Sequence, residues 1–180
     1  YKRQPQLLVW IPKAEPGPTN ENWRPLNLPT TFLRNISGIV IDYITEHWKD
    51  DLHPAQAMAS EFKEAHANYR KAQAALEQGD DRFAGIFLTD LMKAFELVKP
   101  EWIIEVLKAR KVPKWLLAVV NFFIRRRKAV PKLLGRILTP IEIRIGVDMG
   151  NALAPWIFCM AIDPIIRKLN KVPCTLTLAY

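Results

Sequence analysis

The residue with the clearest capacity for chemistry in this sequence is Asp90. It directly follows an apolar run, Phe83–Thr89, that has the length and residue types of a buried β-strand. The residues at 79–81, Gly-Asp-Asp, are typical of a turn before that strand. Because a carboxylate at the end of a buried strand lies at a sheet edge, metal ions and ligands can reach it. The pattern therefore makes Asp90 a candidate metal ligand.

A purely structural role is the alternative for Asp90. The residues after it follow a helical pattern, and Asp is a favoured residue at the N-terminal cap of a helix. The apolar face expected for this helix consists of Leu91, Ala94, Phe95 and Val98. On this stretch alone, capping and metal binding both stay open.

The charge of the chain points to a polyanionic partner. The formal net charge is +8 and the pI is about 9.6. Between Lys108 and Arg144 there are eleven lysine and arginine residues, and Glu142 alone opposes them. A basic face is therefore expected, centred on Arg125–Lys128. The alternative is that these four cations end a helix and interact favourably with its dipole.

The cysteines and apolar runs bear on the compartment. Cys159 and Cys174 lie in apolar stretches without metal-ligand spacing, so reduced thiols in an intracellular protein are expected. No secretory signal is visible. The longest apolar runs, Trp115–Ile124 and Ala152–Ile162, are shorter than the ~20 residues that span a bilayer, so no membrane partner is expected. The chain begins at Tyr1 and stops at Tyr180 in a strand-like run, and both ends are expected to be cut.

Periodicity and turn signals predict the elements that position these residues. Strands at 7–11 and 23–28 are expected to form a hairpin, and Thr30 or Thr31 is expected to cap a helix that ends near Trp48. The apolar face of that helix is predicted to comprise Phe32, Ile36, Ile39, Val40, Tyr43 and Ile44. Further helices are expected at about 60–78, 101–110, 114–127 and 153–170, with a two-stranded ribbon at 128–134 and 137–147, a tight turn at 146–150 and a final strand from 174. Core positions are expected for Trp10, Trp23 and Trp102, and surface positions for His47, His53 and His66.

Three sequence islands occur in a characteristic order. The first runs from Trp10-Ile-Pro-Lys13 through a loop to Trp23-Arg-Pro-Leu-Asn-Leu-Pro29, and the second is Phe87-Leu-Thr-Asp-Leu-Met-Lys-Ala-Phe95. The third is Gly146-Val-Asp-Met-Gly-Asn-Ala-Leu-Ala-Pro-Trp-Ile-Phe158, and the chain then ends in Leu178-Ala-Tyr180. Together they resemble the reverse transcriptase domain of non-LTR (LINE-type) retroelements, and more weakly group II intron enzymes. The resemblance covers the chain from about Leu8 to Tyr180.

This resemblance implies a two-metal polymerase site. Asp90 matches the first catalytic aspartate, and the main-chain carbonyl of Leu91 matches a further ligand of two Mg²⁺ ions. Tyr180 matches the tyrosine that starts the family's Tyr-Ala-Asp-Asp motif, whose aspartates this sequence does not reach. We therefore expect that the isolated chain does not polymerise DNA.

The resemblance also implies a nucleotide site. Arg24 matches an arginine of the fingers that contacts the incoming triphosphate, and Lys13 matches a lysine before the fingers loop that is expected to assist it. Phe95 matches the residue that excludes a 2′-hydroxyl. The alternative for Phe95 is a purely structural position in the core, and the alternative for Lys13 is a solvated position in a loop. In the third island, Met149 stands where the family usually has Gln, and Gly150 follows it. Asp148 stands where Arg or a polar residue is common, so it is expected to add negative charge beside the triphosphate.

The fold class implied is α+β, the fingers and partial palm of a right-hand polymerase without its thumb. One incomplete domain, 1–180, is expected, with 1–82 mostly fingers, 83–107 and 146–180 mostly palm, and 108–145 a basic helix and hairpin region. An RNA template and a DNA primer are the expected partners of Arg125, Arg126, Arg127, Lys128 and Gly146, and dNTP is the expected substrate. Two other functions stay open: a non-catalytic nucleic-acid-binding remnant of such a polymerase, and a helical interaction module without a nucleic-acid role.

Overall fold

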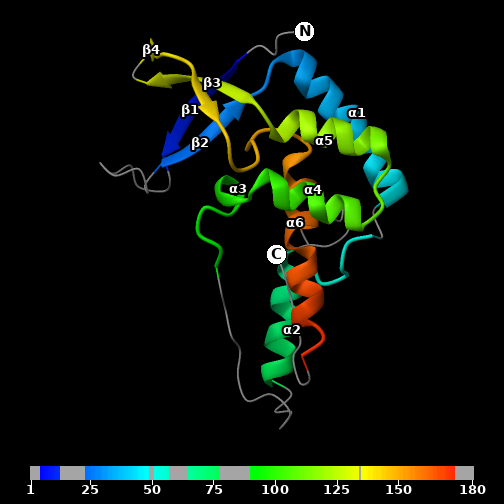
Figure 1. The fold of residues 1–180 in the computed structure, drawn as a ribbon. Helices are drawn as coiled ribbons and strands as arrows, with labels where there is room; N and C mark the ends of the chain where they lie inside the picture. Colours follow the sequence, from blue (N-terminus) through cyan, green and yellow to red (C-terminus); the bar gives the residue numbers. More distant parts are fainter. Residues whose placement is uncertain are drawn as a thin grey trace.

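The computed structural model describes residues 5–12, 23–48, 51–56, 65–77, 90–133 and 135–172. The described residues form a mixed α/β fold in which a sheet lies at one end and most helices lie at the other (Figure 1). The strands are β1 (Gln6–Pro12), β2 (Trp23–Leu28), β3 (Arg127–Leu133), β4 (Arg136–Ile137) and β5 (Ile141–Ile143). The helices are α1 (Thr31–Trp48), α2 (Ala65–Glu77), α3 (Ala94–Leu97), α4 (Pro100–Ala109), α5 (Lys114–Ile124) and α6 (Ala154–Leu169).

The sheet is mixed, with the strand order β2-β1-β3-β4 and with β5 also paired to β3. The predicted hairpin is confirmed, because β1 and β2 are antiparallel and Ile11 is paired with Arg24. The predicted ribbon is confirmed as well: β3 is antiparallel to β4 and β5, and Gly135 lies between β3 and β4 with a φ of 77°. β1 and β3 are parallel, with Leu7 opposite Val130, and this pairing joins the two hairpins into one sheet.

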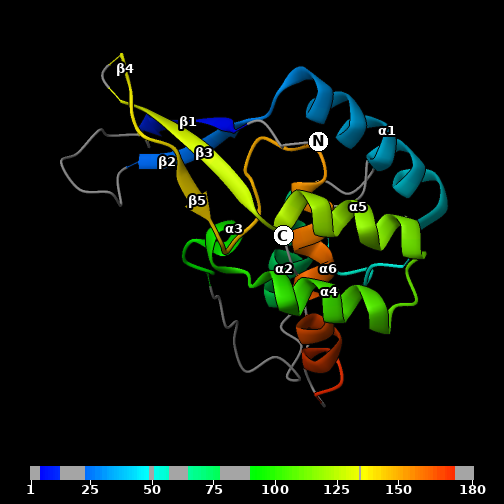
Figure 2. The same cartoon turned by 45° about the horizontal axis from the view of Figure 1, so that its top comes forward.

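The hydrophobic core lies among α1, α4, α5 and α6, which Figure 2 shows gathered beside the sheet. Prolines and caps explain where these helices begin. Thr30 Oγ1 accepts a 3.4 Å hydrogen bond from the amide of Leu33 at the start of α1, as the sequence predicted. Pro100 starts α4, and Pro155 lies in the first turn of α6. The largest fully buried apolar side chains of these helices are Ile44, Ile103, Leu107, Leu116, Val120, Ile124, Ile157 and Met160.

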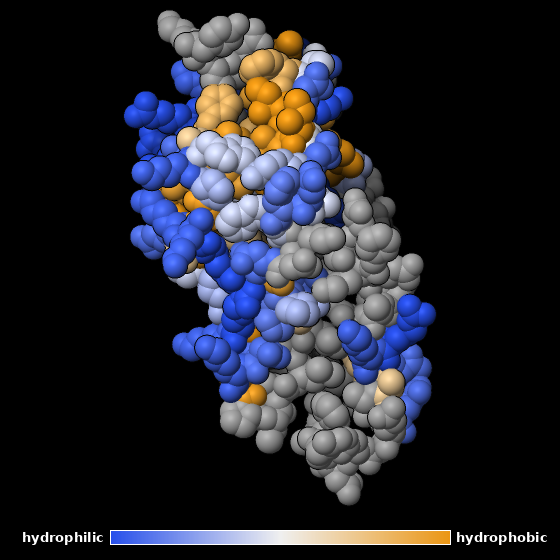
Figure 3. Space-filling model, turned by 90° about the vertical axis from the view of Figure 1, so that its right-hand side faces the viewer, coloured by the Kyte–Doolittle hydropathy of each residue, from blue (hydrophilic) through white to orange (hydrophobic). Residues whose placement is uncertain are grey.

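The predicted apolar face of α1 is partly wrong. Phe32 and Ile39 are 63% and 70% exposed, whereas the small polar residue Ser37 is buried. Ser37 fits inside because its hydroxyl donates a 2.9 Å hydrogen bond to the carbonyl of Arg34. The buried face therefore follows Leu33, Ser37, Val40 and Ile44. Apolar side chains therefore remain on the surface. Figure 3 shows a face of the molecule on which hydrophobic residues gather at the upper end.

The tryptophans also differ from prediction. Trp102 is 41% exposed, so its assignment to the core is wrong. Its indole N–H donates a 2.8 Å hydrogen bond to the carbonyl of Ala161, which fixes the ring at the surface between α4 and α6. Trp10 and Trp23 are half-buried in the first hairpin. Within the described part of the chain, no helix is long and apolar enough to cross a membrane.

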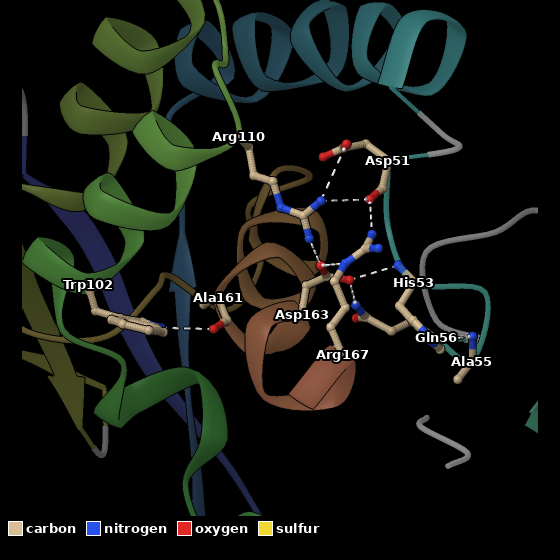
Figure 4. Close-up of polar contacts among 9 residues, drawn as sticks. All are labelled: Asp51, His53, Ala55, Gln56, Trp102, Arg110, Ala161, Asp163 and Arg167. Carbon is tan, nitrogen blue, oxygen red and sulfur yellow. Dashed lines mark hydrogen bonds and ion pairs between the residues drawn. The ribbon is translucent and has the colours of Figure 1, made fainter. Parts of the chain in front are cut away.

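A buried ion cluster around Asp163 joins three segments (Figure 4). The Asp163 side chain on α6 is 0% exposed and is paired with Arg167, at 2.5 Å, and with Arg110 at the end of α4. It also accepts hydrogen bonds from the main-chain N–H of His53, at 2.7 Å, and from Gln56 Nε2, at 2.8 Å. Segment 51–56 is thereby tied to α4 and α6. His53 is half-buried in this cluster, so the predicted surface position is wrong, whereas His47 is exposed as expected.

We predict that Asp163→Asn destabilises the fold by about 3–5 kcal/mol, because two arginines would lose the carboxylate that neutralises them. Urea unfolding measures this change. Glu142→Gln is the matched control, since Glu142 is paired with Arg144 at 3.1 Å on the surface and its loss is expected to cost below about 1 kcal/mol. Equal unfolding midpoints for the two variants would contradict the prediction.

Candidate functional site

The loop 146–150 lies between β5 and α6 and meets the segment that follows Asp90 (Figure 2). The amide of Gly146 donates a 2.8 Å hydrogen bond to the carbonyl of Val98. The next amide, of Val147, donates a 2.6 Å hydrogen bond to the carbonyl of Phe95. Two main-chain bonds therefore fix the start of the third sequence island to the end of the second island and to the residues just after it.

The other end of the loop is fixed to β2, the strand that carries Arg24. The amide of Asn27 donates a 3.0 Å hydrogen bond to the carbonyl of Met149. Asn27 also donates through Nδ2 to the carboxylate of Asp148 at 2.6 Å. The loop 146–150 thus brings all three islands together, although Asn27 and Asp148 are 121 residues apart in the sequence.

Two glycines make this close approach possible. Gly146 has a φ of 80°, and a Cβ at this position would lie 2.5 Å from the carbonyl oxygen of Glu96. Gly150 has a φ of 102°, and a Cβ there would overlap the carbonyl oxygen of Asn27. Both positions need glycine twice over, for the left-handed backbone and for the space. The tight turn predicted at 146–150 is confirmed.

The buried side chain of Arg127 holds the same loop from β3. Its Nη1 is paired with Oδ1 of Asp148, and its Nη2 donates hydrogen bonds to the carbonyls of Ile145, at 2.6 Å, and Gly146, at 2.8 Å. The side chains of Arg127 and Asp148 are only 2% and 3% exposed. This pair therefore lies inside the molecule, and each charge neutralises the other.

The Arg127–Asp148 pair corrects two predictions. Asp148 does not add exposed charge beside a triphosphate, because its carboxylate is buried and neutralised. Arg127 does not belong to the basic face, because α5 ends at Ile124 and Arg126 adopts a φ of 50° that turns the chain into β3. Arg127 then alternates inward, while its neighbours Arg126 and Lys128 are exposed. The idea that all four cations end a helix is wrong for the same reason.

The roles of Asn27 and Arg127 in holding the loop were not predicted from the sequence. Strand alternation contains a signal for Arg127, because it shares the inward face of β3 with buried Ala129 and Pro131. For Asn27 the only signal is a polar residue at an inward-facing position of β2. Gly146 is also buried, against the backbone of Glu96, and its contact with nucleic acid stays a prediction.

Asp90 and Leu91 are both exposed, so the Asp90 carboxylate does not point into packed interior. The capping interpretation is wrong, because the residue at the N-terminal cap of α3 is Lys93, with a φ of 52°. The helix predicted after Asp90, with an apolar face from Leu91 to Val98, is limited to the short α3. The predicted strand Phe83–Thr89 lies outside the described residues, as do Lys13 and Tyr180.

The remaining predicted residues lie near these contacts or on the surface. Phe95 is half-buried, and its ring stacks on Phe158 of α6 with 4.7 Å between centroids. Arg24 is exposed on β2. Arg125 is exposed as well, and its Nη2 lies 3.4 Å from Oε1 of Glu101. Burial raises the pKa of the Cys159 thiol from 9.0 to about 11, so this cysteine stays protonated near neutral pH and is a poor nucleophile.

The donor atoms at Asp90 suit a hard cation. A carboxylate oxygen and the adjacent main-chain carbonyl of Leu91 are ligands that Mg²⁺ prefers. Among the described residues, no group of three or more His, Cys, Asp or Glu side chains could hold a metal ion. Asp90 and the Leu91 carbonyl therefore fit a magnesium ion as part of its ligand set.

We predict that Gly146→Ala and Gly150→Ala each destabilise the fold by more than about 1 kcal/mol, because each adds left-handed strain and a backbone clash. Gly38→Ala is the control. Gly38 lies in α1, and no heavy atom lies within 4 Å of the position that a Cβ would take there, so alanine is expected to stabilise the fold by about 0.5–1 kcal/mol. Thermal unfolding of the three variants compares them, and a loss of stability in the Gly38 variant equal to the others would argue against site-specific strain.

Comparison with known proteins identifies the family. Residues 11–180 match the model of the reverse transcriptase (RNA-dependent DNA polymerase) family. The chain is also 27% identical over 169 residues to the retrovirus-related Pol polyprotein from the type-1 retrotransposable element R2 of Nasonia vitripennis. That alignment covers 91% of this chain and 16% of the relative, so the chain spans a small part of the length of this relative. The chain therefore belongs to the reverse transcriptase (RNA-dependent DNA polymerase) family.

Proposed function

We propose that this chain is the nucleotide-binding and metal-binding part of an RNA-directed DNA polymerase from a non-LTR retroelement. The observation that carries the proposal is the loop 146–150, which is hydrogen-bonded both to the segment after Asp90 and to the strand of Arg24. A polymerase needs a carboxylate, a phosphate-binding cation and a backbone that can approach a nucleotide within one small region. The family membership and the likeness to the R2 Pol polyprotein support this assignment.

In this proposal the chain comprises the fingers and part of the palm. Residues 1–82 are mostly fingers, residues 83–107 and 146–180 are mostly palm, and residues 108–145 form the basic helix and hairpin region. The sheet and the loop link these regions: β2 pairs with β1, β1 pairs with β3 of the basic region, and loop 146–150 is bonded to Asn27 of β2 and to Arg127 of β3. We also propose that the protein acts inside the cell, where RNA templates and DNA primers occur.

Asp90 and the carbonyl of Leu91 would supply oxygen ligands for Mg²⁺. When two such ions are bound, they activate the primer hydroxyl and neutralise the triphosphate charge. Arg24, with its fork of donors, would bind phosphate oxygens, and Lys13 would assist it. Phe95 would limit the space beside the sugar, and its stacking on Phe158 would hold the ring in place.

The nucleotide would lie against Met149 and Gly150. Gly150 is exposed and lacks a side chain, so the backbone can approach a bound nucleotide closely. Met149 offers no amide for a hydrogen bond, so this contact would depend on packing.

The template and primer would be bound through exposed cations next to the sheet. Arg125, Arg126 and Lys128 are exposed around the junction of α5 and β3 and offer charge to phosphates. This surface also suits the second candidate, a polymerase remnant that binds nucleic acid without catalysis.

We predict that Asp90→Asn abolishes primer extension in a polypeptide that continues past Tyr180 through the parent reading frame. Removal of the charge would weaken metal binding without changing side-chain size. Asp42→Asn, which alters an exposed carboxylate on α1, is expected to leave extension unchanged. Full extension by the Asp90 variant would refute its catalytic role.

The isolated 180-residue chain is expected not to extend a primer, because it lacks the aspartate pair that follows the matching tyrosine in the polymerase motif. Measurable extension by the isolated chain would contradict this.

We predict that replacing Arg126, Lys128 and Lys132 with Gln weakens binding of an RNA–DNA duplex and flattens its salt dependence by up to about 0.9 per lost phosphate contact. The matched control replaces Lys71, Lys168 and Lys171, which are exposed elsewhere, and binding should then hold. Filter binding between low and high salt measures the slopes. The second candidate, a non-catalytic remnant, would be favoured by two results together. The longer polypeptide would show no polymerase activity, and its binding of the duplex would survive Asp90→Asn.

A further inference from the structure

Two buried side chains from separate strands converge on the buried side chain of Asp148 in the loop 146–150. Asn27 of β2 and Arg127 of β3 both donate to the same oxygen, Oδ1 of Asp148. The three residues are 7%, 2% and 4% exposed, respectively. Arg127 also donates to the carbonyls of Ile145 and Gly146, so one guanidinium holds both the side chain and the backbone of this loop.

Stability does not explain why two charges are buried here. Removing an arginine and a carboxylate from water costs several kcal/mol, and apolar replacements of buried ion pairs are often neutral or stabilising. The network is also incomplete: within the described part of the chain, Arg127 Nε and Asn27 Oδ1 are buried without a hydrogen-bond partner. A half-satisfied network is a costly way to add stability.

What the network does achieve is a fixed position for the backbone of Met149 and Gly150. Arg127 holds the carbonyls at the start of the loop, Asp148 is held in its middle, and the amide of Asn27 binds the Met149 carbonyl at its end. Each contact comes from the sheet, whereas Phe95 and Val98 hold the opposite side. A misplacement of about 1 Å near reacting groups can cost about 10²-fold in rate.

We infer that Asn27, Arg127 and Asp148 are positioning residues for deoxynucleoside triphosphate binding, and this inference rests on the proposed function. They act through the loop and do not touch the nucleotide. The acidic side chain of Asp148 has Arg127 as its buried counter-ion. The chain thus holds this loop with an acidic side chain at position 148 and a buried arginine from the neighbouring strand.

The first test measures amide hydrogen exchange in the 180-residue chain. Asp148→Asn keeps the side-chain size but removes the charge, and we expect the amides of Asn27, Gly146 and Val147 to exchange about tenfold faster or more, relative to core amides of α4. Asp163→Asn is the matched control, because it also removes a buried carboxylate paired with arginine but does not contact the loop. It should speed exchange only in proportion to the global loss of stability.

A second variant keeps the test decisive if Asp148→Asn fails to fold. Arg127→Lys keeps the charge but cannot reproduce the fork that reaches the carboxylate and two carbonyls. We expect faster exchange at Gly146 and Val147 and a smaller change at Asn27. Exchange patterns that match those of Asp163→Asn in both variants would overturn the inference.

The second test measures primer extension by the longer polypeptide. Asp148→Asn and Arg127→Lys are expected to raise KM for dNTP about tenfold or more, whereas Asp163→Asn should lower the melting temperature without changing KM. An unchanged KM in the loop variants would overturn the positioning role. If the wild-type polypeptide extends no primer, the proposed function fails, but the exchange test still decides whether these residues fix the loop.

Discussion

The arrangement of the site depends on one buried guanidinium. Arg127 enters the interior because α5 stops at Ile124 and the left-handed conformation of Arg126 redirects the chain. Once inside, it must be neutralised, and Asp148 is the carboxylate that does so. This requirement draws the loop 146–150 onto the sheet, where Asn27 completes the contact. This electrostatic requirement acts together with the main-chain hydrogen bonds to Phe95 and Val98 and with the burial of Val147 in the core to set where the loop lies.

The elements and the family could be predicted because their signals are local. The helix starts are marked in the sequence, by prolines in α4 and α6 and by the capping residue Thr30 in α1. Turn residues and strand alternation gave both hairpins, because strands that follow one another in the sequence usually lie side by side in a sheet. The exposed position of Asp90 agrees with a carboxylate available to ligands, although the strand predicted before it lies outside the described residues.

Most of the rest depended on contacts that no local pattern encodes. Four consecutive cations suggest a solvated face, and Arg127 turns inward because the helix ends at Ile124 and the alternation of β3 begins after it. The bond between Asn27 and Asp148 spans 121 residues, so neither residue type reveals the other. The face of α1 was misassigned because Ile39 is apolar yet exposed, while Ser37 satisfies its hydroxyl within the helix and is buried. Hydrophobicity alone could not separate these two.

The parallel pairing of β1 with β3 has a consequence for biosynthesis. Leu7 lies opposite Val130, so the inner edge of the first hairpin stays open until the ribosome has synthesised the chain beyond Val130. An open strand edge offers main-chain hydrogen bonds to any other extended chain, and pairings of such long sequence separation form slowly. Nascent copies of this protein would therefore pass through an aggregation-prone interval, in which a chaperone that covers exposed strands would raise the yield of folded molecules.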